Sequence, residues 1–199
     1  MSKRSSGYSL GYSLIEALTV VAIIGMIALC AVPAFANYRR RMSVMAAADQ
    51  LRSILRLTRS RAIAANHNVG VKFIAGREWT YAIYEDGNGN GVLNDDIARG
   101  IDRRVFGPAV VMPSFHIATI GLLRTTVKDP DGDALDPGAS PVQFGRSTIC
   151  SFSPVGSGTP GTVYLVDGGG QLWAARCTGA GGRVRVLRYD GARRKWETR

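Results

Sequence analysis

The stretch GYSLIEALTVVAIIGMIALCAVPAFA, residues 11–36, decides the fold. Within it, residues 17–36 contain no charged side chain. A run of about 20 such residues has the length that an α-helix needs to cross a bilayer core. A cleaved secretory signal has a shorter apolar core, of about 7–15 residues, so the length favours retention of this segment. The sequence therefore predicts a transmembrane helix over residues 12–36.

A single acidic residue, Glu16, stands at the start of the apolar run. An unpaired carboxylate is costly inside hydrocarbon, which makes such a residue a functional candidate. Glu16 is equally compatible with the first turn of a helix, where the helix dipole stabilises a negative charge at low cost. The apolar run alone leaves both interpretations open.

The residues around Glu16 favour the functional interpretation. The motif GYSLIE at residues 11–16, behind a short basic leader, resembles the class III signal of type IV prepilins and type II secretion pseudopilins. The resemblance implies that a prepilin peptidase cuts between Gly11 and Tyr12 and N-methylates Tyr12. It also implies that Glu16, the fifth residue of the mature chain, aligns subunits during assembly. The similar tetrapeptide at residues 7–10 has no acid at the corresponding position and is not the implied cleavage site.

Within this superfamily, the chain is most similar to the minor pseudopilin called type II secretion system protein H and to FimT-like minor pilins. The similarity rests on a long body, on the motif YEDGNGNG at residues 84–91 and on GRVR at residues 182–185. It implies a structural subunit of a type II secretion pseudopilus, which serves protein secretion across the outer membrane. The alternative is a minor pilin of a type IV pilus that binds DNA during natural transformation.

The resemblance also implies a location and a set of partners. Residues 1–11 would be a cleaved leader, and the mature protein would pass once through the bacterial inner membrane with its C-terminal body in the periplasm. The implied partners are a prepilin peptidase, other pseudopilins or pilins in a filament, and the membrane. DNA joins this set under the alternative function.

Beyond the apolar run, the pattern stays helical to about residue 65. Apolar residues recur at spacings of three, four and seven, which indicates an amphipathic helix over residues 37–66. From residue 67 onward, β-branched and aromatic runs separated by glycine-rich turns indicate strands. The expected fold is α+β and pilin-like, with the long N-terminal helix packed on an antiparallel β-sheet and residues 67–199 forming a β-rich domain. The expected strands cover residues 69–74, 79–84, 147–152, 162–166, 172–177 and 183–189.

The composition excludes several classes of protein. The content of hydrophobic residues, 46%, is too high for a fully disordered chain, and the 24 glycines have no collagen-like period. The net charge of +10 is concentrated in two segments, 38–61 and 176–199, so an anionic partner should meet these segments. With two histidines and no nucleophile, phosphate-loop or zinc motif, the sequence predicts neither catalysis nor a cofactor.

Two acidic loops are candidate cation sites. Asp86, Asn88 and Asn90, followed by glycine, match the opening of a calcium loop, but the closing glutamate of that motif is missing. The same residues are typical of an Asn-Gly turn, which is the favoured interpretation. The second loop contains four aspartates at residues 129–136 and is expected to be a solvated surface loop.

The positions of the cysteines allow a disulfide but do not establish one. Cys150 and Cys177 fall on predicted strands of one sheet, and closing the intervening loop would stabilise the fold by roughly 3 kcal/mol. The sequence does not show whether their Cα atoms come close enough for a bond. Cys30 lies in the apolar run and is expected only to pack there.

The basic C-terminal segment is the candidate DNA contact. Arg183 and Arg185 alternate with valines, so a strand would place both guanidinium groups on one face. Arg188 follows, with aromatic residues nearby, and arginine with aromatic rings can bind phosphates and bases. The favoured interpretation is nevertheless a basic edge strand and tail that keep the protein soluble. Arg52, Arg56 and Arg59, on a shared face of the predicted helix, are likewise expected to be a solvated surface, which in a filament could meet acidic neighbours.

Overall fold

The computed structural model describes residues 13–112 and 118–198. Two compact units divide the chain, one ending at Arg39 and the other comprising Arg40–Arg199. The long helix α1 (Leu14–Ala65) contributes to both units. Gly11 and Tyr12, the implied cleavage and methylation positions, lie outside the described residues.

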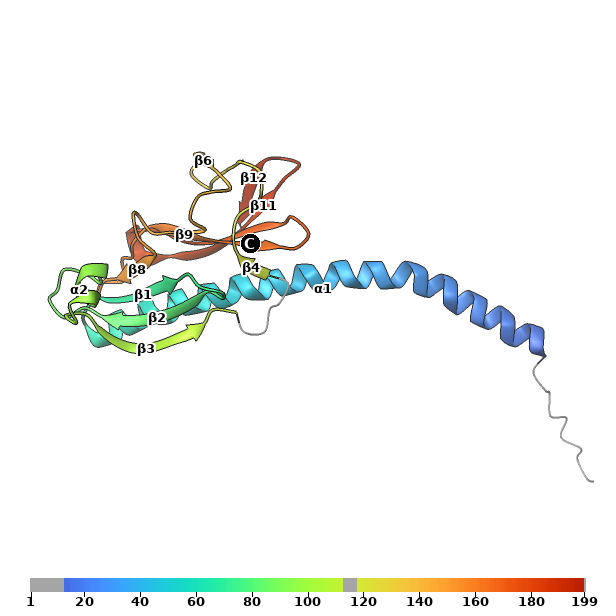
Figure 1. Cartoon of the computed structure of the whole chain (residues 1–199), viewed down its shortest axis with the longest axis horizontal. Helices are drawn as coiled ribbons and strands as arrows, with labels where there is room; N and C mark the ends of the chain where they lie inside the picture. The colour runs from blue at the N-terminus through green and yellow to red at the C-terminus, as the bar shows by residue number, and fades with distance from the viewer. Residues whose placement is uncertain (1–12, 113–117, 199) are drawn as a thin grey trace, which may run out of the picture. The chain divides into compact units, whose positions relative to one another are not determined.

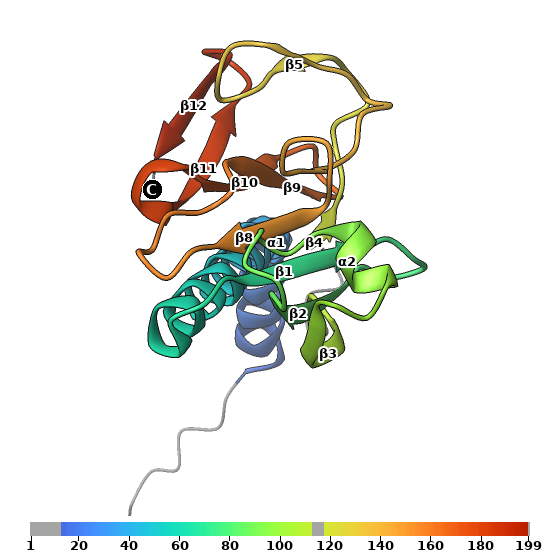
Figure 2. The same ribbon diagram turned by 90° about the vertical axis from the view of Figure 1, so that its left-hand side faces the viewer.

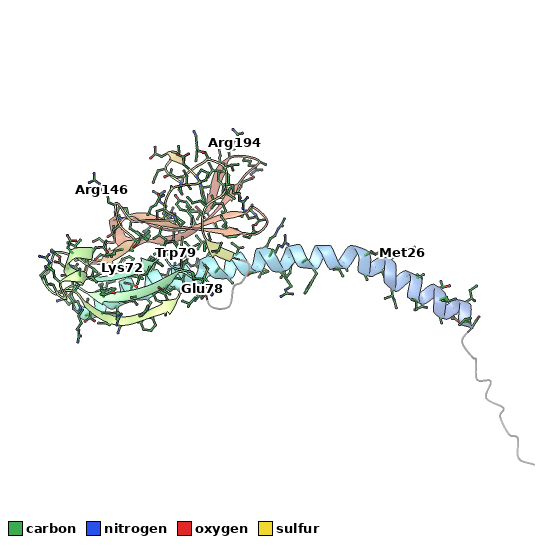
Figure 3. The ribbon with its side chains drawn as sticks, viewed as in Figure 1. Met26, Lys72, Glu78, Trp79, Arg146 and Arg194 are labelled. Carbon is green, nitrogen blue, oxygen red and sulfur yellow. The ribbon has the colours of Figure 1, made fainter. Side chains whose placement is uncertain are left out.

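The first unit contains the apolar part of α1, and its apolar side chains are exposed. Leu18 is 61% exposed, and Met26, which projects from the helix in Figure 3, is 71% exposed. Glu16 is exposed in the first turn of the helix. The other large apolar side chains exposed on this part of α1 are Leu14, Ile15, Val20, Val21, Ile23, Ile24, Ile27, Leu29, Val32 and Phe35.

The predicted membrane span is wrong. Among the described residues, no helix meets both the length and the apolarity that a bilayer crossing requires. That prediction rested on the absence of charge over residues 17–36. This finding overturns the span at 12–36 and, with it, the expected single-pass inner-membrane location with a periplasmic body.

In the second unit, α1 is amphipathic, as its sequence pattern predicts. Val44, Leu51 and Leu55 are fully buried, whereas Leu57 is 59% exposed. Residues three, four and seven apart lie on one face of an α-helix, so this spacing directs one stripe of side chains into the core. The buried stripe packs in one hydrophobic cluster with residues from both main sheets of this unit.

The strands of the second unit form two main antiparallel sheets (Figures 1 and 2). In the described residues, a four-stranded sheet has the order β3-β2-β1-β8, and a larger sheet has the order β12-β11-β10-β9-β4, with β7 also paired to β9. A small hairpin of β5 and β6 is separate from both. The bounds are β1 (Val69–Ile74), β2 (Thr80–Glu85), α2 (Asn94–Ala98), β3 (Arg103–Val110), β4 (Ala118–Ile120), β5 (Val127–Lys128), β6 (Ala134–Leu135), β7 (Val142–Gln143), β8 (Ile149–Phe152), β9 (Gly161–Asp167), β10 (Leu172–Cys177), η1 (Ala180–Gly182), β11 (Val184–Asp190) and β12 (Lys195–Thr198).

The α+β prediction is confirmed, but its division into sheets needs correction. The expected strands at residues 69–74 and 79–84 are present and form a hairpin, since β1 pairs with β2 from Val69 opposite Glu85 to Ile74 opposite Thr80. Two main sheets replace the single sheet expected from the sequence, and they separate the two cysteine-bearing strands. Cys150 lies in β8 of the four-stranded sheet, and Cys177 ends β10 of the other.

Candidate functional site

Four arginines from two elements line one cleft in the second unit. Helix α1 supplies Arg56 and Arg59. Arg183 immediately precedes β11, and Arg185 lies within it. The cavity between them has a volume of about 300 Å³. Gly182, at the end of the short helix η1, and Val184 complete its lining. The arginine face of α1 is therefore part of a cationic cleft and not an isolated solvated surface.

The position of Arg59 is fixed by a glycine-rich wall. Its Nε donates a hydrogen bond of 2.9 Å to the carbonyl oxygen of Gly156. A side chain at Gly182 would place its Cβ 2.3 Å from that same oxygen, and the φ of Gly182 is +53°. Both the close approach and the left-handed backbone require glycine at this position. The loop after β8 thus holds Arg59, and Gly182 packs closely against that loop.

The alternation of β11 separates its apolar and charged side chains. Val184 and Val186 are buried, while Arg183 and Arg185 are exposed, as the sequence pattern predicts. In the described part of the chain, no carboxylate forms an ion pair with any of the four arginines that line the cleft. Four unpaired guanidinium groups around one cavity favour an anionic ligand, because each can donate several hydrogen bonds to phosphate or carboxylate oxygens.

The third arginine of the predicted DNA contact has a different environment. Arg188 pairs with Glu197 of β12, with Nη2 3.2 Å from Oε2. Arg193 contacts the same carboxylate at 3.4 Å. The C-terminal residues 195–198 are therefore a paired strand and not the frayed tail expected from the sequence. Arg188 does not line the cleft.

The candidate calcium loop is organised by hydrogen bonds within the chain. The Asp86 carboxylate accepts bonds from the backbone N–H groups of Asn88, Gly89 and Gly91, at 3.0, 2.8 and 2.6 Å. Burial alone would raise the pKa of Asp86, but these bonds and a side-chain bond from Asn68 outweigh burial and lower it. The oxygens that would face a cation instead accept bonds from the turn, and the described residues contain no cluster of metal-ligating side chains.

The amides of this loop bind a buried carboxylate. Asn90 and Asn88 donate to Asp96 of α2 at 2.9 and 3.3 Å, and Arg99 donates to it at 2.5 Å. The bond from Asn90 lowers the pKa of Asp96, and those from Asn88 and Arg99 act in the same direction against the effect of burial. The loop that contains Asp86 is therefore tied to α2.

The second acidic loop is also satisfied from within the chain. Asp129 accepts bonds from the backbone N–H groups of Asp131 and Asp133, at 2.8 and 2.9 Å. Asp131 is bound by Arg176 at 2.5 Å, and Asp136 accepts from Thr126 at 2.8 Å. These contacts connect the loop around β5 and β6 to the larger sheet.

The sequence pattern identified two of the four arginines that line the cleft as candidate binding residues. Arg183 and Arg185 are marked by a short motif, whereas Arg56 and Arg59 are separated from them by more than a hundred residues. The only signal available was the presence of two strongly basic segments in one chain. Their meeting depends on the packing of α1 against the larger sheet, which the sequence pattern does not specify.

The helix on antiparallel sheets, with an apolar N-terminal half, defines the chain as a pilin-like α+β protein. A family model described as Type II transport protein GspH matches residues 47–188. This match covers more than half of the chain, and the protein belongs to the GspH family of pilin-like pseudopilins. The search of curated proteins and that of solved structures find no match. Members of this family are structural subunits, and membership implies assembly with other pseudopilins in a filament.

Proposed function

We propose that this protein is a minor pseudopilin of a type II secretion pseudopilus and acts as a structural subunit. The observation that supports this function most strongly is the apolar surface of α1 before Arg39. Ile15, Leu18 and Ile24 are 74%, 61% and 59% exposed. Exposed apolar residues that are contiguous on one element mark a surface that binds a partner. In a filament, the matching helices of neighbouring subunits would bury them.

The magnitude of this burial is sufficient to drive assembly. Covering a large aliphatic side chain contributes about 1.5–3 kcal/mol. Several such side chains on each helix therefore exceed the estimated association cost of about 4–15 kcal/mol. The second unit would then remain available for contacts with other subunits or with cargo.

Processing of the N-terminus belongs to the same proposal. Cleavage after Gly11 would make Tyr12 the first residue, and methylation would modify its amine. Glu16 would then be the fifth residue of the mature chain and would align the subunits as they join the filament. Mass spectrometry of protein from a host with an active prepilin peptidase should find methylated Tyr12 at the N-terminus. An intact residue 1–11 segment in that host would contradict this part of the proposal.

A complementation assay tests the secretion function. Deletion of the gene in the host should abolish release of type II cargo into the medium, and the wild-type chain should restore it. Glu16→Gln should fail to restore release, because it removes the charge assigned to alignment. Glu78→Gln is the matched control, since Glu78 is also exposed but lies in the β1–β2 turn. Normal cargo release after deletion would reject the function.

A second function is supported by the arginine cleft. A minor pilin that takes up DNA would need a cationic surface, and Arg183 and Arg185 share theirs with Arg56 and Arg59. Phosphate contacts of this kind make affinity strongly dependent on salt. The cleft therefore favours DNA uptake as the alternative to protein secretion.

Titration of DNA with the full-length chain over a salt series tests this alternative. Changing Arg183 and Arg185 together to Ala should weaken binding and reduce the log–log salt slope by about one for each phosphate that the variant no longer binds. Arg77→Ala is the control, because Arg77 is exposed in the β1–β2 turn. Absence of binding at low salt, or equal affinity of the double variant and the control, would reject DNA binding through the cleft.

A further inference from the structure

Two buried cysteines belong to the same hydrophobic core, one from each main sheet. Cys150 lies opposite Val71 in the four-stranded sheet, and Cys177 lies opposite Gly161 in the larger sheet. Both side chains are fully buried and both are free thiols. Cys150 Sγ lies 3.6 Å from the carbonyl oxygen of Thr159, and a Cβ at the adjacent Gly158 would lie 3.0 Å from Cys177 Sγ. Two neighbouring residues of one loop therefore contact the two sulfurs, which places both thiols in the same small region of the core.

The strands that carry these cysteines continue into the two walls of the cleft. Beyond β8, the chain reaches Gly156, which accepts the hydrogen bond from Arg59. Beyond Cys177, it passes through η1 to Arg183. The N–H of Gly158 donates to the carbonyl oxygen of Gly179 at 3.2 Å, which joins the two walls.

Backbone packing keeps this region closely spaced. A Cβ at Gly158 would lie 3.0 Å from the Cys177 sulfur and 2.7 Å from the Phe152 ring. The loop after β8 therefore packs directly against Cys177 and Phe152. A covalent bond at this point would connect both sheets and both walls of the cleft.

The two thiols differ in acidity. Burial raises the pKa of Cys150 well above its ordinary value, and the hydrogen bond that it donates to Cys177 acts in the same direction. The same hydrogen bond lowers the pKa of Cys177 against the effect of burial, with further help from the charge of Arg59. In the folded core, Cys177 is therefore the more acidic of the two thiols.

We propose that Cys150 and Cys177 form a disulfide when the chain folds in the presence of a disulfide oxidant, and that this bond links the two sheets under the arginine cleft. With oxidised glutathione, the Cys177 thiolate attacks one glutathione sulfur and releases the first glutathione thiolate. Cys150, as its thiolate, then attacks the Cys177 sulfur and releases the second. The cysteine pair loses two electrons and two protons, and one oxidised glutathione becomes two reduced glutathiones. The inference depends on neither proposed function.

Burial determines when the reaction occurs. Both side chains are inaccessible in the folded chain, so exchange takes place while the core is forming. Once closed, the bond is shielded from reductants by the same packing. The bond restricts a loop of about 28 residues in the unfolded chain, which raises the midpoint of thermal unfolding by about 6–12 °C.

Refolding of the full-length chain tests the proposal. A Cys30→Ser background removes the third thiol, and a non-ionic detergent keeps the exposed apolar helix soluble. The chain is unfolded, refolded with either oxidised or reduced glutathione, unfolded again and alkylated. We expect the oxidised sample to lack alkylation at Cys150 and Cys177, to have lost two hydrogen atoms by mass and to yield one linked peptide. Alkylation of both cysteines after oxidative refolding would overturn the proposal.

Two further measurements distinguish a covalent disulfide from two cysteines that only pack against each other. The oxidised and reduced samples have one sequence, so a thermal midpoint higher by about 6–12 °C in the oxidised sample isolates the bond, and equal midpoints would contradict its proposed role. In Cys150→Ser, Cys177 should retain a glutathione adduct, because the resolving thiol is absent.

Discussion

The two units contain parts of one helix whose apolar residues have opposite environments. Before Arg39, α1 exposes Leu18 and Ile24 at 61% and 59%. In the second unit, the same helix buries Leu51 and Leu55 completely. Since the side chains are chemically alike, the difference lies in whether the chain itself supplies a partner. The second unit supplies one through its sheets, and the first leaves its apolar residues available to other subunits.

Charge patterning explains this difference. In the second unit, Arg52, Arg56 and Arg59 share one face of α1 and leave an apolar stripe on another, which is typical of a helix that packs on one side. Residues 17–36 have no charge on any side. A helix without a polar face can be covered all around, as it would be in the core of a filament.

The largest expected difference between the units is in the effect of truncating a leucine. Leu51→Ala should lower the free energy of unfolding of the second unit by about 2–5 kcal/mol, because it leaves a cavity in the core. Leu18→Ala removes the same atoms from an exposed position and should change that free energy by less than about 0.5 kcal/mol. Denaturant unfolding followed by tryptophan fluorescence measures both, and equal losses would break the comparison.

Low pH should reduce the stability of the second unit, because the hydrogen-bonded carboxylates Asp86 and Asp96 lie in that unit. Asp86 and Asp96 have lowered pKa values in the folded chain. Their contribution to stability is therefore complete above the ordinary aspartate pKa of about 3.9 and is lost as the pH falls through the lower folded values. The unfolding midpoint in denaturant should be level near neutral pH and should decrease below about pH 4.

Asp86→Asn should reduce this acid dependence, since an amide cannot lose stability by protonation. Asp95→Asn is the matched control, because Asp95 is exposed in the first turn of α2. If Asp86→Asn retained the full acid slope of the wild-type chain, the turn would not be stabilised by the Asp86 charge.

The smallest effect is expected on the solvent face of α1 within the second unit. Leu57 is 59% exposed although it lies between buried helical positions. Leu57→Ala should change the free energy of unfolding by less than about 0.5 kcal/mol, as measured by denaturant titration. A loss comparable to that of Leu51→Ala would show that this face is covered.

Local patterns predicted the regular elements of the fold well. The period of Val44, Leu51 and Leu55 located the buried stripe, and the run of residues 172–177 coincides with β10. These elements were predictable because side-chain periodicity reflects burial directly.

The remaining elements lacked such patterns. Strand β3 has an exposed, arginine-rich start and contains Gly107-Pro108, a pair that is typical of turns. Strand β12 is short and charged, and its pairing with β11 depends on the turn at residues 191–194. The second sheet and the arginine cleft both depend on contacts between distant segments, which a local pattern does not encode.

Cross-linking from the first unit tests the central claim most directly. A photoreactive amino acid at Leu18, introduced into the full-length protein in host cells, should form adducts with other pilin-like subunits on irradiation. Val155, which is 88% exposed in a loop of the second unit, is the control position for general surface contact. The filament account predicts abundant subunit adducts from Leu18 and few from Val155. Failure of Leu18 to capture any pilin-like subunit, in cells that secrete normally, would contradict it.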